Sequence, residues 1–371
     1  MTVGTEVRPS FPFACVNCGR AYPHEGMPYR CPHCGGVFDF QEPMSYNPGP
    51  ADPGIGIGRY RAGFPLAPEA RWHSLGEGGT PLVSIDIDQR TIYFKCEYQN
   101  PTGSFKDRGA AVLTSALADA GVEEAIEDSS GNAGAAFAAY AARAGIRARI
   151  FIPDYASGPK QRQIESYGAE VVRILGPRST TTEATLAEAE KGAVYASHAY
   201  LPHVIAGFAT IAFEIYEQLG RAPSTVVLPV GQGTLLLGVY RGFKALLAGG
   251  YIDKLPELIG VQARACAPLW SVFHGGGAGL TWISEGETLA EGIRILKPLR
   301  GDGVLRAVEA SGGTMLVVEE AEIAEGRDAL GHRGLYVEPT SAVVWPALLE
   351  VLEARGGPLV AILTASGLKA A

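Results

Sequence analysis

The stretch Asn100-Pro-Thr-Gly-Ser-Phe-Lys-Asp-Arg-Gly109 is the most informative part of this chain. Asn-Pro-Thr-Gly is typical of a turn, and Ser104 is suited to cap the helix that we expect over residues 104–120. Lys106 then lies in the first helical turn, where the helix dipole disfavours positive charge and so favours a neutral amine. Schiff-base formation requires a neutral amine, although a surface lysine paired with Asp107 is an alternative interpretation.

Three other segments place glycines or hydroxyl groups at the ends of expected strands. Ser129-Ser-Gly-Asn-Ala-Gly134 opens a helix, and its backbone N–H groups would suit a carboxylate. Pro229-Val-Gly-Gln-Gly-Thr-Leu235 also opens a helix and would hold a phosphate in the same way. Leu363-Thr-Ala-Ser-Gly-Leu-Lys369 puts hydroxyl groups just after the last strand. Each turn alone is compatible with ordinary packing, whereas their combination with Lys106 is specific.

Short apolar runs alternate with helical segments from about residue 91 onward. We expect strands at 91–95, 147–153, 169–175, 225–230 and 257–263, and a strand with a turn at each of 124–130 and 357–367. We expect helices at 133–145, 158–168 and 233–249 in addition to the one at 104–120. This alternation predicts parallel strands joined by right-handed crossover helices, a doubly wound α/β fold.

Composition and charge limit the class of function. The chain has 371 residues, of which 47% are hydrophobic and 19% charged, so it is not intrinsically disordered. A formal net charge of −8 argues against nucleic acid and anionic membranes as partners. No apolar run is long enough to span a bilayer, and the N-terminus lacks a signal-peptide pattern. We therefore expect a cytoplasmic protein with no nucleic-acid or membrane partner.

Four of the six cysteines form two pairs with metal-site spacing. Cys15 and Cys18 are separated by two residues, as are Cys31 and Cys34, and a glycine follows each pair. Two such knuckles can direct four thiolates at one Zn²⁺, which gives a closed structural site with no position for catalysis. Four unliganded thiols are the alternative. Cys96 and Cys266 are expected to be small core residues.

Taken together, these motifs resemble the fold type II pyridoxal-phosphate enzymes, the tryptophan synthase β-like family. The resemblance covers roughly residues 75–370, and Asn100–Gly109 has the form found in threonine synthases. The stretch Gly76-Glu-Gly-Gly-Thr-Pro-Leu82 resembles the sequence that precedes the motif in that group. Some threonine synthases also carry an N-terminal zinc-ribbon-like segment. The resemblance implies two doubly wound α/β domains preceded by such a segment.

The resemblance also implies a role for each matching residue. Lys106 resembles the lysine that bonds pyridoxal phosphate, Asn132 the asparagine that binds the cofactor's phenolic oxygen, and Thr364 the hydroxyl that faces the pyridine nitrogen. The phosphate-binding loop is matched by Gly231, Gln232, Gly233, Thr234 and Leu235. The α-carboxylate of a small amino-acid substrate is expected at Ser129, Ser130, Gly131 and Ala133, with His198 nearby.

These matches divide the chain into segments. We expect a zinc-ribbon-like segment at residues 1–45, a linker at 46–75 and a catalytic core at 76–371. Within the core, a smaller α/β domain at about 104–200 is inserted into a larger one made of 76–103 and 201–371. A homodimer is implied by the family alone.

The substrate side departs from threonine synthases. That group has an arginine shortly before a Glu-Gly-Gln-Lys-Thr stretch, and this arginine holds the phosphate of O-phosphohomoserine. Here the stretch is Pro202–Thr210, Val204 occupies the aligned position, and no arginine lies within it. This run and Leu289–Ile293 resemble threonine dehydratases, whereas Glu338–Ala342 is closer to threonine synthases. We expect a distal pocket at residues 198–208 with His198, Tyr200, His203 and Phe208, while Arg178, Arg294 or Arg300 could still reach a phosphate.

Several functions are therefore compatible with the sequence. Elimination on L-threonine or L-serine is slightly favoured, because a dianionic phosphate normally needs arginine or lysine partners. Threonine formation from O-phosphohomoserine is the alternative reaction. A non-catalytic binding protein on the same fold is a third possibility, and the intact Lys106 argues against it.

Overall fold

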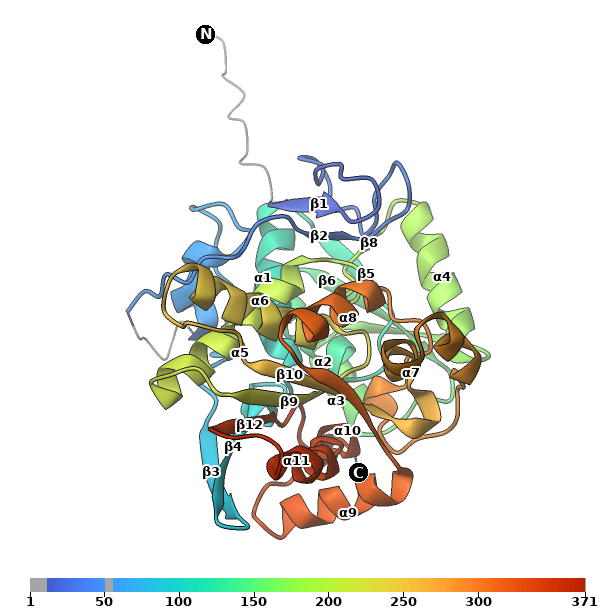
Figure 1. Cartoon of the computed structure of the whole chain (residues 1–371). Helices are drawn as coiled ribbons and strands as arrows, with labels where there is room; N and C mark the ends of the chain where they lie inside the picture. Colours follow the sequence, from blue (N-terminus) through green and yellow to red (C-terminus); the bar gives the residue numbers. More distant parts are fainter. Residues whose placement is uncertain (1–11, 51–55, 371) are drawn as a thin grey trace.

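The computed structural model describes residues 12–50 and 56–370, and its two mainly parallel sheets confirm the expected doubly wound α/β fold (Figure 1). The larger sheet has the strand order β11-β10-β9-β12-β4-β3, and the smaller sheet has the order β7-β6-β5-β8. The strands of the larger sheet are β3 (Leu82–Ile87), β4 (Arg90–Lys95), β9 (Thr225–Pro229), β10 (Glu257–Ala263), β11 (Thr314–Val318) and β12 (Leu359–Ile362).

Two strands of the larger sheet, β3 and β11, were not expected from the sequence. β3 pairs antiparallel with β4, while the other pairings in this sheet are parallel. β3 and β4 are joined directly through Asp88 and Gln89, which have φ angles of 48° and 64°. Positive φ at two adjacent residues is typical of a tight hairpin turn, which allows neighbouring strands to run in opposite directions without a crossover helix.

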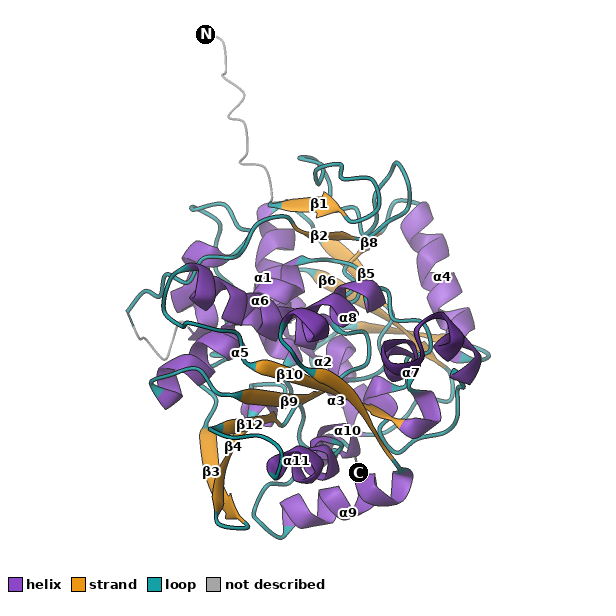
Figure 2. Cartoon of the chain, viewed as in Figure 1, coloured by secondary structure: helices purple, strands orange, loops and turns teal. Residues whose placement is uncertain are grey.

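The smaller sheet is built from residues inside the segment expected as the inserted domain. Its strands are β5 (Glu124–Glu127), β6 (Arg147–Pro153), β7 (Glu170–Ile174) and β8 (Val194–Tyr195). They alternate with the helices α2 (Asn132–Ala144), α3 (Pro159–Ser166) and α4 (Arg178–Glu190) (Figure 2). The exact domain boundaries stay a prediction.

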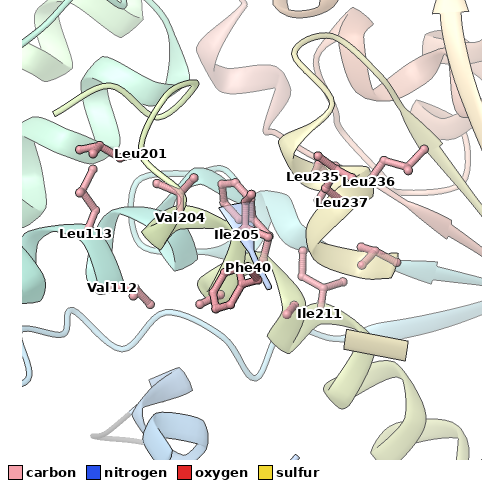
Figure 3. Close-up of a cluster of buried hydrophobic side chains, with 14 of the residues drawn as sticks. Phe40, Val112, Leu113, Leu201, Val204, Ile205, Ile211, Leu235, Leu236 and Leu237 are labelled. Carbon is pink, nitrogen blue, oxygen red and sulfur yellow. The ribbon is translucent and has the colours of Figure 1, made fainter. Parts of the chain in front are cut away.

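Helix α5 (His203–Leu219) is buried over most of its length. It packs between α1 (Lys106–Asp119) and α6 (Thr234–Ala248), with Val204, Ile205 and Ile211 among the buried side chains (Figure 3). Glycine permits the close approach, because a Cβ at Gly207 would clash with the Arg108 carbonyl oxygen. α5 therefore connects the two sheets through its neighbouring helices.

The remaining helices cover the larger sheet and its end. They are α7 (Pro268–Gly275), α8 (Gly301–Ala310), α9 (Glu320–Gly331), α10 (Pro339–Ala342) and α11 (Val344–Leu352). α9, α10 and α11 lie together with the C-terminus at the lower end of the molecule in Figure 1. No helix in the described residues is long and apolar enough to cross a bilayer.

The prediction that Ser104 caps α1 is wrong. α1 begins at Lys106 after Phe105, no side chain caps its start, and the buried Ser104 hydroxyl has no hydrogen-bond partner. Ser104 instead forms an isolated antiparallel bridge with Ala365, so its backbone is held by the C-terminal turn rather than by the helix.

The N-terminal segment is packed onto the catalytic core. β1 (Phe13–Cys15) and β2 (Phe38–Phe40) form a two-stranded antiparallel sheet beside α5. The buried His203 ring at the start of α5 makes edge contacts with Phe13 and Tyr22, with centroids 4.9 and 5.9 Å away. Residues 1–11, the first part of the zinc-ribbon-like segment expected at 1–45, lie outside the described residues.

The segment expected as a linker is also packed in its described part. A 3₁₀ helix at Gly56–Gly63 buries Ile57 and Tyr60. Arg59 donates to the Glu217 carboxylate at 2.7 Å, and the Tyr60 hydroxyl donates to the same group at 3.0 Å. This part of the chain is therefore fixed to α5 and is not a free tether; residues 51–55 are outside the described chain.

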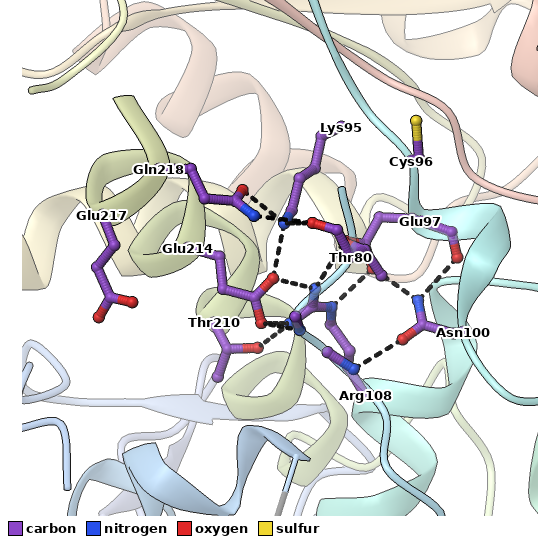
Figure 4. Close-up of polar contacts among 12 residues, drawn as sticks. Thr80, Lys95, Cys96, Glu97, Asn100, Arg108, Thr210, Glu214, Glu217 and Gln218 are labelled. Atoms are coloured by element: carbon purple, nitrogen blue, oxygen red, sulfur yellow. Dashed lines mark hydrogen bonds and ion pairs between the residues drawn. The ribbon is translucent and has the colours of Figure 1, made fainter. Parts of the chain in front are cut away.

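Four charged side chains form a buried network between β4, α1 and α5 (Figure 4). Arg108 donates to Glu97 at 2.6 and 2.7 Å and to Glu214 at 2.7 Å from both terminal nitrogens. Lys95 Nζ lies 2.7 Å from Glu214. Burial alone would raise the pKa of Glu214, but Arg108 and Lys95 hold it below its usual value. Two positive and two negative charges thus compensate one another away from water.

Removing one member of this network should lower the free energy of unfolding far more than breaking an ion pair near the surface. We expect Glu214→Gln to lower the free energy of unfolding by about 3–5 kcal/mol, because Arg108 and Lys95 would lose a buried counter-charge. Glu217→Gln, one turn later on α5 in a half-buried pair, should cost no more than about 2 kcal/mol. Urea unfolding of both variants measures the difference, and similar losses would contradict the central role of the network.

Candidate active site

Three segments that are distant in sequence meet around the turn before Lys106. The Phe105 N–H donates to the Thr364 carbonyl oxygen at 2.9 Å. The hydroxyl oxygens of Thr364 and Ser341 are 2.8 Å apart, and Ser341 also accepts from the Ala365 N–H. The sequence therefore predicted correctly that hydroxyl groups follow the last strand, and the structure places them beside the lysine motif.

Lys106 occupies the first position of α1, as expected. No described residue hydrogen-bonds its amine or forms an ion pair with it, and Nζ lies 4.8 Å from the Phe105 ring centroid and 5.9 Å from that of Phe208. Burial lowers the pKa of Lys106 to about 8, although the nearby carboxylates of Glu127 and Glu338 act to raise it. The alternative pairing with Asp107 does not occur, because Asp107 accepts from the Thr102 backbone.

The segment Ser129–Gly134 follows β5 and includes the first turn of α2. Gly131 precedes α2, and no side chain caps the start of this helix. A Cβ at Gly134 would clash with the Ser129 carbonyl oxygen, so the tight turn requires glycine there. Asn132 donates from Nδ2 to Glu338 at 3.0 Å, while its buried Oδ1 has no partner.

The loop Gly231–Leu235 lies between β9 and α6. Gly233 has a φ of 85°, and no side chain caps α6. A Cβ at Gly231 would lie 3.1 Å from the Ile293 Cα, so the loop backbone is held close to the segment at 292–295. Gln232 accepts from the Leu299 N–H at 3.1 Å. An uncapped helix start with a closely packed glycine loop is suited to bind a phosphate.

A cavity lies beside Lys106, between the lysine and the first part of α5. Its lining is mostly apolar, with Glu127 and His198 as the other ionisable groups; the lining residues are Lys106, Ala110, Leu113, Glu127, Ala133, Phe137, Ala196, His198, Val204 and Phe208. Ala133, His198, Val204 and Phe208 were expected near the substrate, and the structure brings them together with Lys106.

Glu127 is the cavity residue that the sequence did not reveal. It is 1% exposed at the end of β5, and its Oε1 lies 2.7 Å from His198 Nδ1. Burial and then the Asp128 charge raise the pKa of Glu127 well above its usual value. A carboxylate that ends a strand gives no signal of burial, since only the tertiary packing of β8 and α5 encloses it.

Two residues of the expected distal pocket lie elsewhere. His203 packs into the N-terminal segment, as described above, and is not among the residues that line the cavity. Tyr200 contacts Tyr29 and Tyr195, with ring centroids 5.1 and 5.9 Å away. For His203 the reason is helical geometry, because adjacent positions at the start of α5 point to different sides of the helix, whereas Tyr200 lies in the turn before α5.

The three arginines that were considered as phosphate partners have other contacts. Arg300 is buried and donates to the carbonyl oxygens of Phe38, Ala199 and Tyr200 at 2.7, 3.3 and 2.6 Å. Arg294 is 3.9 Å from Glu285. Arg178 lies 3.0 Å from Asp128, which follows Glu127 at the end of β5. None of the three lines the cavity.

The donor groups fit pyridoxal phosphate. An unpaired lysine of lowered pKa can react with an aldehyde. The unpartnered Asn132 Oδ1 and Ser104 hydroxyl are polar atoms that a bound ligand could satisfy. The uncapped start of α6 offers backbone N–H groups to a phosphate. The residues present are therefore those that this cofactor requires.

The four predicted metal ligands also converge. The sulfur atoms of Cys15, Cys18, Cys31 and Cys34 all lie within 4.8 Å of one another. Cys96 and Cys266 are fully buried in the core, which confirms their expected place. His24 and His33 are not part of the cluster.

Comparison with known proteins points to one family. The family described as pyridoxal-phosphate dependent enzyme matches residues 73–365. Threonine synthase of Methanocaldococcus jannaschii is 33% identical over 96% of this chain and 92% of its own length. Threonine synthase of Synechocystis sp. is 36% identical over 84% of this chain and 82% of its own. A solved threonine deaminase from T.th. is similar with a TM-score of 0.65 and 28% identity, over 77% of this chain and 92% of that chain.

The lowered pKa of Lys106 can be measured in protein freed of bound aldehydes with hydroxylamine. Acylating reagents attack the neutral amine, so we expect modification of Lys106 to increase with pH and to be half-maximal at about pH 8. Peptide mass spectrometry gives the rate, and the exposed Lys244 in the same samples controls for reagent reactivity. A Lys106 that reacts only at the pH of an ordinary lysine would contradict the assigned environment.

Proposed function

Because the chain belongs to the pyridoxal-phosphate dependent enzyme family and is a lyase of that family, we propose that it eliminates water and then ammonia from L-threonine or L-serine. One observation supports this choice above the others: the cavity beside Lys106 and Val204 is lined by an acidic residue and by no arginine. A small hydroxyl side chain suits that cavity, whereas a phosphate would face Glu127 without a guanidinium partner.

The proposed cofactor-binding residues are those that converge around the lysine motif. Lys106 would bond the cofactor's aldehyde carbon, Asn132 would contact its ring oxygen, and Thr364 would face the ring nitrogen. The loop Gly231–Leu235 at the start of α6 would hold its phosphate. A hydroxyl rather than a carboxylate at position 364 would leave the ring nitrogen unprotonated. When bound, pyridoxal phosphate withdraws electrons from the substrate's α carbon and makes loss of its proton feasible.

The chain's own groups would then carry the proton. The neutral Lys106 amine takes the α proton, which its lowered pKa and its lack of an ion-pair partner favour. Backbone N–H groups at Gly131 to Ala133 and the hydroxyls of Ser129 and Ser130 hold the α-carboxylate at the start of α2. Apolar side chains, including Phe137 and Phe208, limit the access of water to the cavity.

Threonine formation from O-phosphohomoserine is the second candidate. The identity of 32–36% to curated threonine synthases favours it. Arg178, which contacts Asp128 near the cavity, is the arginine that could serve such a phosphate. The two reactions share the lysine chemistry and differ in what the distal part of the site must hold.

The choice between the two reactions is tested with purified protein. We expect release of keto acid and ammonia from L-threonine or L-serine with a higher kcat/KM than release of phosphate from O-phosphohomoserine. Lys106→Ala should abolish turnover and the covalent attachment of the cofactor, as detected by borohydride reduction and mass spectrometry. A higher kcat/KM for O-phosphohomoserine would establish the second candidate instead, and normal turnover by Lys106→Ala would refute both.

We further propose that the four-cysteine cluster binds structural zinc. Purified protein should contain about one zinc ion per chain, because four converging thiolates complete a tetrahedral site. Cys15→Ser combined with Cys18→Ser should lose the metal and lower the thermal unfolding midpoint, with a smaller effect on kcat of the remaining folded protein. His33→Ala is the matched control and should retain the metal. Metal-free native protein with four freely alkylated thiols would refute the site.

A further inference from the structure

We propose that Glu127 and His198 form an acid pair that donates a proton to the hydroxyl group leaving the substrate's β carbon. This inference rests on the proposed elimination and assigns that reaction its second acid–base group. It also makes the pair a determinant of specificity, because an acid at this position suits a neutral hydroxyl and not a phosphate.

The geometry supports a role in contact with a ligand. Glu127 and His198 line the same cavity as Lys106; Glu127 is the last residue of β5, and His198 lies in the turn that follows β8. Glu127 Oε1 is held by His198 Nδ1 at 2.7 Å, whereas its buried Oε2 has no hydrogen-bond partner. An unsatisfied carboxyl oxygen is costly in a protein interior, so a 1%-exposed group of this kind needs an explanation. A substrate hydroxyl in the cavity would satisfy it.

The surrounding charges favour a neutral pair that holds one proton. Glu127 is surrounded by Asp128, Arg178, Lys106 and the Tyr195 hydroxyl as well as by His198. Burial, followed by the charges of Lys106 and Arg178, lowers the pKa of His198 well below its usual value. The pKa of Glu127 is shifted upward, so both shifts place the proton on the carboxyl group. With His198 Nδ1 donating to Oε1, the acidic proton resides on the unpartnered Oε2.

The proposed step is balanced in atoms and electrons. Lys106 removes the α proton, and the electron pair that is released forms a double bond between the α and β carbons. The β carbon–oxygen bond breaks, its electrons go to oxygen, and the Glu127 proton converts the leaving hydroxide to water. Lys106 has then gained the proton that Glu127 has lost, and transfer between them through water restores both groups.

The test compares two leaving groups in the holoenzyme. L-serine must expel hydroxide, which needs a proton, whereas β-chloro-L-alanine expels chloride, which needs none. For Glu127→Gln, which keeps the size and a hydrogen bond to His198, we expect kcat on L-serine to fall about 100-fold or more. Turnover of β-chloro-L-alanine should change by no more than a few-fold. In the wild type, activity on L-serine should decline at high pH as Glu127 ionises, and this decline should be absent with β-chloro-L-alanine.

Glu124→Gln is the matched control for a carboxylate on β5. Glu124 lies at the opposite end of the strand from Glu127, 3.3 Å from Arg147, and it does not line the cavity. This variant should leave the ratio of the two activities unchanged. Thermal unfolding and the visible spectrum of the bound cofactor establish that each variant is folded and loaded.

A readout independent of turnover comes from protein labelled with 15N-histidine. The His198 ring should stay neutral at a pH where an ordinary histidine is charged, and its signals should change in Glu127→Gln but not in Glu124→Gln. Equal losses on both substrates in Glu127→Gln, or a charged His198 ring at neutral pH, would overturn the acid pair. A wild type that releases chloride from β-chloro-L-alanine but no ammonia from L-serine or L-threonine would overturn the proposed function instead.

Discussion

The position of Lys106 depends on the buried side chain of Arg108. Arg108 lies two residues after Lys106 at the start of α1 and is bound by Glu97 before the lysine motif and by Glu214 on α5. A fully buried guanidinium with both partners in place has few alternative geometries, because each lost contact would leave a charge unpaired. Gly207 and Gly109 allow the two helices to approach closely enough for these contacts. The network therefore fixes the start of α1, and with it the direction of the Lys106 side chain.

Most of the fold could be predicted because its signals are local. The strand at β6 and the helix at α2 follow from apolar runs and from Gly145, whose φ of 76° ends the helix. The motif around Lys106 and the glycine loops could be read in the same way, since a turn followed by a helix is encoded by adjacent residues. The packed segment at 56–63 could not, because its place depends on contacts with Glu217, which lies far later in the chain on α5.

The difference between local sequence signals and long-range contacts also explains which site residues could be predicted. Lys106, Ala133, His198 and Val204 were expected near the substrate and do line the cavity. Glu127 was missed although it is next to Asp128 in a strand that was correctly predicted, since a carboxylate at a strand end is usually solvated. His203 was misplaced for the opposite reason: its neighbours Phe13 and Tyr22 come from a segment far earlier in the chain. Sequence spacing alone cannot indicate which side of α5 such a segment covers.

Two clusters of buried ionisable side chains, one around Arg108 and one around Lys106, differ in whether their members are paired. Around Arg108 every charge has an opposite partner within hydrogen-bond distance, which is the arrangement that holds a core together. Around Lys106 the amine and Glu127 Oε2 lack protein partners among the described residues. Leaving these groups unpaired costs stability, and burial in the apolar cavity lowers the pKa of Lys106 and raises that of Glu127. The paired network lies on the same helix as the unpaired lysine, so the stable contacts hold in place the groups that are left free to react.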